Sequence, residues 1–216
     1  MTDFEGLQIG RADMVAVLRL NRPDQRNALN RALRDALVET LAGLAEDESI
    51  KAVVLTGAGA TFCAGFDLKE LQSGDAAEIF ADAGAYHRAV HTFGKPLIAA
   101  VNGPALAGGM DLATMCDLRI AVAGAQFGQP QVKFGVPAAF ELTRSQMSET
   151  MARRLVLTGD RIDADEAMAA GYLCAVVPDD KALERAAMDW ANRIAESAAS
   201  GAMKAQIVAA QPKLFG

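Results

Sequence analysis

Continuous and alternating runs of hydrophobic residues along the chain predict a series of strands. Residues 14–20 (MVAVLRL) alternate between apolar and polar positions, which favours a strand. Residues 51–57, 96–101 and 118–123 are instead continuous apolar runs, typical of strands that are buried on both faces. A further strand is predicted over 172–177.

The segments between these strands have apolar residues at helical spacing, which predicts helices. Asn30 can cap a helix whose apolar positions recur every three or four residues, at Leu33, Leu37, Leu41 and Leu44. Asp163 and Glu166 have the spacing of a capping box, and Gly171 ends the short helix that follows them. Further helices are expected over 76–92, 179–197 and 200–210. Because strands and helices alternate without a linker, the sequence predicts one α/β unit.

Composition and charge exclude several classes of protein. The chain has 216 residues, of which 51% are hydrophobic and 22% charged, so disorder, collagen and coiled coil are ruled out. A net charge of −6 argues against nucleic-acid and anionic-membrane partners. The most apolar stretch is broken by Pro104, Asp111 and several glycines, and the acidic N-terminus lacks the apolar core of a signal peptide, so neither a membrane span nor a leader is expected.

Cysteine and histidine usage fits a reducing compartment without metal chemistry. Three widely spaced cysteines form no CxxC motif, which favours reduced thiols, a cytoplasmic location and no zinc site. His87 and His91 have helical i, i+4 spacing, but no third ligand is in view, so we expect helix residues, with His87 a candidate for the wall of a pocket. Cys63 has no histidine near it in sequence and is not expected to be a nucleophile.

Two similar turns follow two of the predicted buried strands. Residues 63–68 (CAGFDL) come after VVLTG, and residues 107–112 (AGGMDL) come after LIAAV. Turns of glycine and alanine let backbone N–H groups approach a ligand closely, and a helix that begins there adds its positive end. Such turns are also common as plain connections in α/β proteins. If both point at one oxygen, they form an oxyanion hole, in which each donor supplies roughly 3–4 kcal/mol of transition-state stabilisation.

The sequence around these turns resembles the crotonase family of enoyl-CoA hydratases and isomerases. The resemblance covers nearly the whole chain, with matching segments in family order at 21–30 (NRPDQRNALN), 53–71, 95–121, 125–137 (AQFGQPQVKFGVP) and 157–178. It implies a crotonase-like spiral of ββα units over 1–197, followed by a shortened C-terminal helical segment over 198–216. It also implies an acyl-CoA thioester substrate, with coenzyme A as part of that substrate and no other cofactor or metal, and a homotrimer or dimer of trimers.

The resemblance assigns roles to individual residues. The N–H groups of Phe66 and Gly108 would hold the thioester oxygen and stabilise an enolate. The residues that would line the CoA moiety, largely through backbone atoms, are Arg26, Ala28, Ala64, Asp67 and Leu68. Lys69 is a candidate for a phosphate contact, with a solvated helix lysine as the alternative. Asp67 can also act as the N-cap of the helix that it opens.

The expected acid/base residues depart from the family's pattern. Family hydratases use two glutamates, and the corresponding positions here are Asp111 and Gln131. A glutamine amide cannot transfer protons at neutral pH and can only orient its neighbours. Glu141 is a possible second carboxylate, because it follows GVPAAF in a stretch that faces the acyl pocket in relatives.

Three readings of the function therefore remain open. The first is an acyl-CoA lyase or isomerase of the enoyl-CoA hydratase type in fatty acid metabolism, with Asp111 as the acid/base and Gln131 orienting substrate or water. The second is hydrolysis or decarboxylation of a CoA thioester on the same scaffold. The third is a catalytically degenerate CoA-binding or assembly subunit. A nicotinamide enzyme is rejected because TGAGATF (56–62) lacks a full GxGxxG motif.

Overall fold

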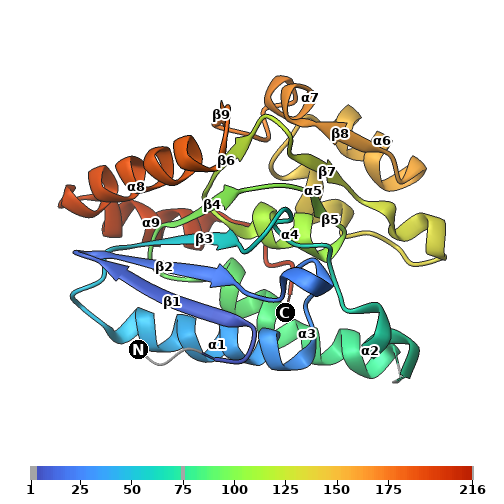
Figure 1. The fold of residues 1–216 in the computed structure, drawn as a ribbon, viewed down its shortest axis with the longest axis horizontal. Coiled ribbons are helices and arrows are strands. Elements are labelled where there is room, and N and C mark those ends of the chain that lie inside the picture. Colours follow the sequence, from blue (N-terminus) through green and yellow to red (C-terminus); the bar gives the residue numbers. More distant parts are fainter. Residues whose placement is uncertain (1–3, 74–75, 216) are drawn as a thin grey trace.

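A largely parallel six-stranded sheet forms the centre of the computed structural model, which describes residues 4–73 and 76–215 (Figure 1). Its strand order is β1-β2-β3-β4-β6-β9, and β1 is the antiparallel member. A second, three-stranded sheet has the order β5-β7-β8. The strands are β1 (Leu7–Ala12), β2 (Val15–Leu20), β3 (Ala52–Gly57), β4 (Leu97–Val101), β5 (Ala105–Leu106), β6 (Leu118–Val122), β7 (Gln126–Gly128), β8 (Arg161–Asp163) and β9 (Ala175–Val177).

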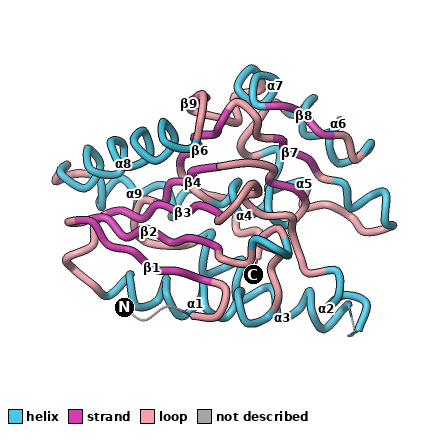
Figure 2. Tube along the Cα trace, viewed as in Figure 1, coloured by secondary structure: helices cyan, strands magenta, loops and turns pink. Residues whose placement is uncertain are grey.

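Helices cover both faces of the large sheet (Figure 2). Helices α1 and α3 pack against each other on one side, and α8 packs on the other side against β2, β3, β4 and β6. The α-helices are α1 (Arg31–Glu46), α2 (Leu68–Ser73), α3 (Ala76–His91), α4 (Gly108–Met115), α5 (Phe140–Arg144), α6 (Glu149–Thr158), α7 (Ala164–Ala169), α8 (Asp180–Glu196) and α9 (Ser200–Ala210). Two 3-10 turns, η1 (Pro23–Gln25) and η2 (Pro130–Phe134), complete the fold.

Most of the predicted elements are confirmed, and the departures are local. All six residues of β3 are buried, as the continuous apolar run predicts. Asn30 accepts a hydrogen bond from the Leu33 N–H at 3.1 Å, and Asp163 and Glu166 form the expected capping box. The strand predicted over 172–177 is shorter, because only 175–177 pair with β6 while Tyr172 turns into the core. Strand β1, the three strands of the small sheet, and helices α5 and α6 are not foreseen.

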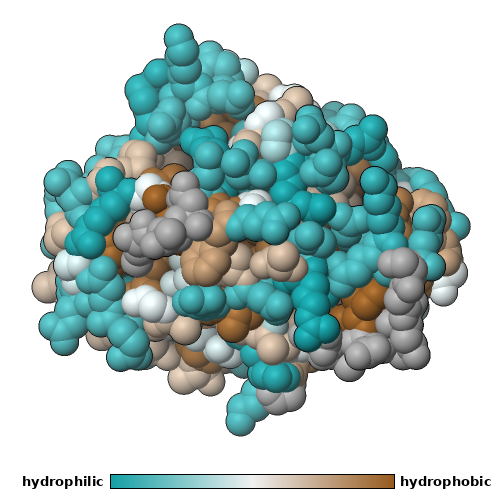
Figure 3. Space-filling model, turned by 60° about the horizontal axis from the view of Figure 1, so that its bottom comes forward, coloured by the Kyte–Doolittle hydropathy of each residue, from teal (hydrophilic) through white to brown (hydrophobic). Residues whose placement is uncertain are grey.

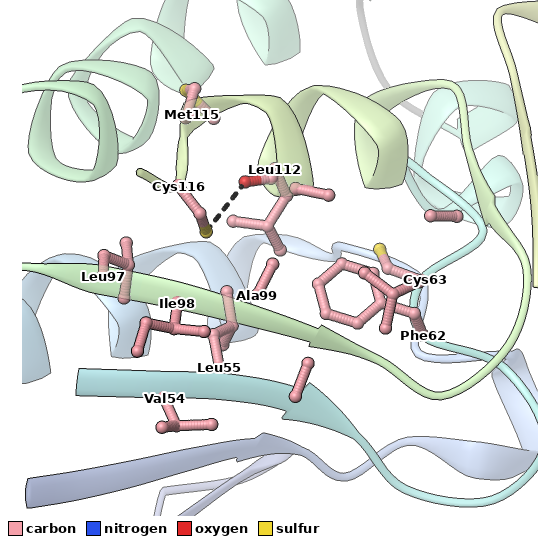
Figure 4. Packing of buried hydrophobic residues seen from close by; sticks show 14 of the residues in the cluster. Val54, Leu55, Phe62, Cys63, Leu97, Ile98, Ala99, Leu112, Met115 and Cys116 are labelled. Carbon is pink, nitrogen blue, oxygen red and sulfur yellow. Dashed lines mark hydrogen bonds between the residues drawn. The ribbon is translucent and has the colours of Figure 1, made fainter. Parts of the chain in front are cut away.

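Core packing fixes helix α4 over one face of β3 and β4 (Figure 4). Leu112 and Cys116 point from α4 onto the sheet, where they meet Leu55 and Ala99 (Figure 4). The Cys116 thiol donates a hydrogen bond back to the Leu112 carbonyl oxygen at 3.4 Å. All eight residues of α4 are buried, so the helix cannot shift without disrupting the core. The residues that it carries are therefore held rigidly.

The segment after α9 folds back onto α3. Gln211 donates to the His91 carbonyl oxygen at 2.6 Å, and Arg88 donates to the Phe215 carbonyl oxygen at 2.8 Å. The Phe215 ring stacks on His87, with ring centres 4.8 Å apart. The C-terminal residues thus lie beside α3 near the middle of the molecule, as Figure 1 shows.

The outer surface is polar over most of its area in one view. Hydrophilic residues spread over most of the face drawn in Figure 3, and brown areas are confined to patches between them. Within residues 4–73 and 76–215, no helix has the length and apolar content needed to cross a membrane. The first three residues of the acidic N-terminal stretch lie outside the described residues.

Candidate active site

The two glycine-containing turns lie side by side at the ends of β3 and β4. Cys63 and Ala105 form an isolated parallel bridge, in which the Leu106 N–H donates to the Cys63 carbonyl oxygen at 3.0 Å. Gly65 has a φ of +99°, and a Cβ on it would lie 3.1 Å from the Gly108 nitrogen. The sequence-predicted donors at Phe66 and Gly108 therefore belong to turns in direct contact.

The backbone that leads into α4 is strained where the second donor is presented. Ala107 has φ +50° and ψ −126°, a conformation that a residue with a side chain rarely adopts. The Ala107 N–H is held by the Gly128 carbonyl oxygen at 2.9 Å. Gly108 is the first residue of α4, so its N–H has no carbonyl partner within the helix and lies at the helix's positive end. This geometry suits an N–H that receives an anionic oxygen.

Asp111 lies one turn further along α4, in a buried environment. It is 7% exposed, and Gln129 donates a hydrogen bond to its carboxylate at 2.8 Å. Burial raises the pKa of the Asp111 carboxyl to about 7, although the hydrogen bond from Gln129 acts in the opposite direction. A carboxyl group with a pKa near neutrality can both accept and donate a proton under physiological conditions.

A chain of amides leads from Asp111 to Gln131. Gln131 donates to the Gln129 side-chain oxygen at 2.8 Å, and Gln129 in turn donates to Asp111 and, at 3.2 Å, to the Thr143 hydroxyl. The side-chain oxygen of Gln131 is buried and has no hydrogen-bond partner in the described part of the chain. An amide oxygen can accept a hydrogen bond, but it cannot supply a proton.

Three further titratable side chains of this region have pKa values that burial shifts. The Tyr86 hydroxyl is buried without a hydrogen-bond partner among the described residues, and this burial raises the pKa of Tyr86 well above its usual range. Burial likewise raises the pKa of the Cys63 thiol to about 12, which leaves it protonated and agrees with the expectation that it is not a nucleophile. Burial, with the positive charges of Arg34 and His91, lowers the pKa of His87 to about 4, so this ring is neutral.

The residues expected to contact CoA lie on two joined loops. The Ala64 N–H donates to the Arg26 carbonyl oxygen at 3.0 Å, which ties the loop after β2 to the first donor turn. Ala28 is 8% exposed, while Leu68 is 63% exposed. Arg26 and Lys69 also have exposed side chains.

Asp67 has a structural role that the sequence indicates only in part. Its carboxylate accepts a hydrogen bond from the Lys69 N–H at 3.0 Å, which confirms the N-cap interpretation. It also pairs with the Arg22 guanidinium at 2.9 Å. Burial acts to raise the pKa of Asp67, but the Arg22 and Lys69 hydrogen bonds outweigh it and the pKa is lowered. The ionised carboxylate of Asp67 therefore stabilises the turn through its contacts with Arg22 and Lys69.

Glu141 lies outside the chain of hydrogen bonds around Asp111. Its side chain is 57% exposed and pairs with Arg144 at 2.6 Å on the same short helix. The residue two positions later, Thr143, is the one that faces Gln129. Successive helix positions two apart point to nearly opposite sides, so the face of α5 that carries Thr143 excludes Glu141. Glu141 thus lies outside the hydrogen bonds that link Asp111, Gln129 and Thr143, and its catalytic role stays a prediction.

Sequence reasoning misses three residues that hydrogen-bond to the candidate site residues or to their loops: Gln129, Arg22 and Asn27. Gln129 lies within the GQPQ motif, two residues from the expected position, and only the fold shows that its amide reaches Asp111. Asn27 is fully buried, with φ +54°, and donates to the Ala58 and Thr61 carbonyl oxygens at 2.9 and 2.7 Å. Asparagine tolerates this left-handed conformation, and its place in NRPDQRNALN is the signal that could have identified it.

The fold and the two adjoining turns are those expected of a crotonase-type protein, and comparisons with known proteins show the family. A family model described as enoyl-CoA hydratase/isomerase matches residues 10–213. The 2,3-dehydroadipyl-CoA hydratase of Escherichia coli is 41% identical over 184 residues, covering 83% of this chain and 72% of that protein. The crotonyl-CoA hydratase of Syntrophomonas wolfei is 35% identical over 187 residues, covering 83% and 72%.

Solved structures show the same architecture. An enoyl-CoA hydratase from Bacillus anthracis superimposes with a TM-score of 0.89 at 32% identity, covering 94% of this chain and 82% of that one. Pseudomonas aeruginosa DspI gives a TM-score of 0.92 at 30% identity, covering 99% and 91%. The chain belongs to the enoyl-CoA hydratase/isomerase family, and its mixed α/β fold with two sheets is that of the crotonase family.

Proposed function

We propose that this protein moves a proton between carbon atoms of an enoyl-CoA thioester, with Asp111 as its acid/base. The observation that carries the proposal is the buried carboxyl group of Asp111, with a pKa raised to about 7, one helical turn from the expected donor at Gly108. The position that is a second glutamate in family hydratases is Gln131, and Glu141 pairs with Arg144 instead. One carboxylate is enough to take a proton from one carbon and return it to another.

The proposed steps balance without any other reactant. With a 3-enoyl thioester, ionised Asp111 takes a proton from the α carbon, and the electron pair of the broken C–H bond moves into an enolate whose oxygen accepts hydrogen bonds from the Phe66 and Gly108 N–H groups. Protonated Asp111 then donates to the γ carbon, the double bond shifts to the α–β position, and the carbonyl re-forms. The two N–H donors stabilise the charge that develops on oxygen, roughly 3–4 kcal/mol each.

Hydration is the second candidate, and two observations favour it. Relatives at 41% and 35% identity are named as hydratases. The side-chain oxygen of Gln131, which has no partner among the residues that the structure describes, can accept a hydrogen bond from a water molecule beside Asp111. In this case Asp111 alone would have to serve both water activation and proton return.

We propose that the loops around residues 26–28 and 64–68 hold the CoA moiety through backbone groups, with Lys69 at a phosphate.

We also propose a homotrimer or dimer of trimers in the cytoplasm. Support for assembly comes from α9, which buries the charged Lys204 and exposes Met203 and Ile207 at 52% and 47%. The free thiols of Cys63 and Cys116 suit a reducing compartment. Light scattering coupled to gel filtration measures the assembly.

Two substrates separate the candidate reactions. A 3-hexenoyl-CoA and crotonyl-CoA are incubated with the protein in deuterium oxide and followed by mass spectrometry. The proposal predicts conversion of the 3-enoyl to the 2-enoyl thioester with partial deuterium incorporation and little addition of water. Rapid gain of one water by crotonyl-CoA supports hydration instead. Binding of both without any change would refute both reactions.

A further inference from the structure

Arg34 places a guanidinium group in the protein interior, beside the first donor turn. The residue lies on α1 and is 2% exposed. A buried arginine needs several partners to offset the loss of its hydration. Its Nη1 donates to the Leu29 carbonyl oxygen at 2.9 Å, and its Nη2 donates to the Glu70 carboxylate at 2.8 Å. Nothing in the proposed proton transfer uses this charge.

The partners of Arg34 flank the turn that carries Phe66. Leu29 and Phe66 form an isolated parallel bridge, in which the Leu29 N–H donates to the Gly65 carbonyl oxygen at 2.8 Å and the Asp67 N–H donates to the Leu29 carbonyl oxygen at 3.3 Å. Glu70 lies in α2, which begins directly after this turn. One guanidinium group thus holds the chain segments on both sides of the donor.

Arg34 also contacts the side chain of Phe66, the residue expected to supply the first N–H donor. Its guanidinium carbon lies 5.1 Å from the centre of the Phe66 ring, which is within the range of a cation–π contact. The same ring packs against the second donor: a Cβ on Gly108 would lie 2.9 Å from Phe66 Cδ2. The Phe66 ring therefore acts as a spacer between the two donor turns, and Arg34 fixes where that ring lies.

We propose that Arg34 is a positioning residue of the oxyanion hole, which sets the distance between its two N–H donors by holding the Phe66 ring. The inference rests on the proposed function, since it assumes that these donors bind the thioester oxygen. A misplacement of about 1 Å in such a site costs on the order of 100-fold in rate. The effect of Arg34 should therefore appear in kcat and in carbonyl polarisation, more than in affinity for the CoA moiety.

A chromophoric thioester reports carbonyl polarisation directly. Cinnamoyl-CoA absorbs at longer wavelength when its carbonyl oxygen accepts strong hydrogen bonds, so the red shift on binding measures the donors' placement. We expect Arg34→Met to lose most of the red shift and roughly 10- to 100-fold in kcat, with KM changed by less than about threefold. Arg34→Lys, which keeps the charge but not the planar fork, should fall in between.

Arg153 provides a matched control. It also pairs with a carboxylate, Glu149, and lies 5.7 Å from the ring of Phe140, but its side chain is 61% exposed. Arg153→Met should leave the red shift and kcat unchanged. A purely structural role for Arg34 would lower the melting temperature of its variants without changing the red shift of the folded protein, and that result would overturn the inference.

A double-mutant cycle tests whether Arg34 acts through the ring. If it does, Arg34→Lys costs much less in a Phe66→Leu background than alone, since the ring that it holds is gone. Equal costs in the two backgrounds would overturn the inference, and this test needs only the conservative lysine variant to fold. Failure of the proposed function is distinguishable, because wild-type protein would then bind cinnamoyl-CoA without any red shift.

Discussion

Replacing Asp111 by Asn should change how the stability of the protein depends on pH. The carboxyl group has a pKa of 3.8 in the ordinary case and about 7 in the fold, because burial penalises its charged form. The folded state thus holds its proton over a range in which the unfolded chain has lost it. Stability is retained below the unfolded pKa and falls as pH rises towards the folded one.

The size of the effect follows from these two values. At 1.36 kcal/mol per pKa unit, ionised Asp111 costs the folded state about 4 kcal/mol well above pH 7. Between about pH 5 and pH 8.5 the wild-type protein should lose about 3 kcal/mol relative to Asp111→Asn. Asn keeps the side-chain oxygen that accepts from Gln129, so other contributions largely cancel in the comparison.

Urea unfolding at several pH values measures this difference. Both proteins are unfolded under matched concentration, and the difference between their free energies of unfolding is plotted against pH. The account predicts that the Asn variant gains steadily on the wild type as pH rises to about 7, and that the curves then run parallel. A difference that stays constant over the whole pH range would mean that Asp111 has an ordinary pKa, which would remove the basis for its acid/base role.

Three further changes test the site and its frame. The same Asp111→Asn variant should lose at least roughly 100-fold in kcat, and wild-type kcat/KM should rise with pH up to about 7, as initial rates would show. Gln131→Glu should raise the hydrated fraction of crotonyl-CoA, measured by mass spectrometry, whereas Gln131→Met should not. Lys204→Met should lower the free energy of unfolding by about 3 kcal/mol, because Lys204 is buried and pairs with Asp117 at 2.7 Å; an unchanged urea midpoint would contradict this.

The elements with strong local signals are predictable from the sequence. The apolar run of β3 and the cap at Asn30 depend on neighbouring residues, and both lie where the pattern predicts. Strand β1 escapes because glycine and charged residues interrupt its pattern, and five of its six residues keep some exposure. Its pairing with β2, which the local pattern does not contain, defines it.

The site is predictable only as far as its backbone turns and motif positions. The motif alone indicates Asp111 and Gly108 as candidates, and the structure places both in the first turn of α4. The motif does not reveal the hydrogen-bond partner of Asp111. That partner, Gln129, lies 18 residues away and comes into contact through the packing of α4 against the second sheet. The pattern also does not show that Glu141 pairs with Arg144 while Thr143 bonds to Gln129, since the orientation of the short helix α5 decides which residue faces inward.

Exchange of the α protons of a saturated thioester tests the central claim most directly. Butyryl-CoA cannot be isomerised or hydrated, so deuterium uptake from deuterium oxide reports enolate formation alone. The account predicts uptake with the wild-type protein and loss of uptake with Asp111→Asn, although the variant still binds butyryl-CoA. Uptake that persists in the variant would contradict Asp111 as the base, and wild-type binding without uptake would contradict enolate chemistry altogether.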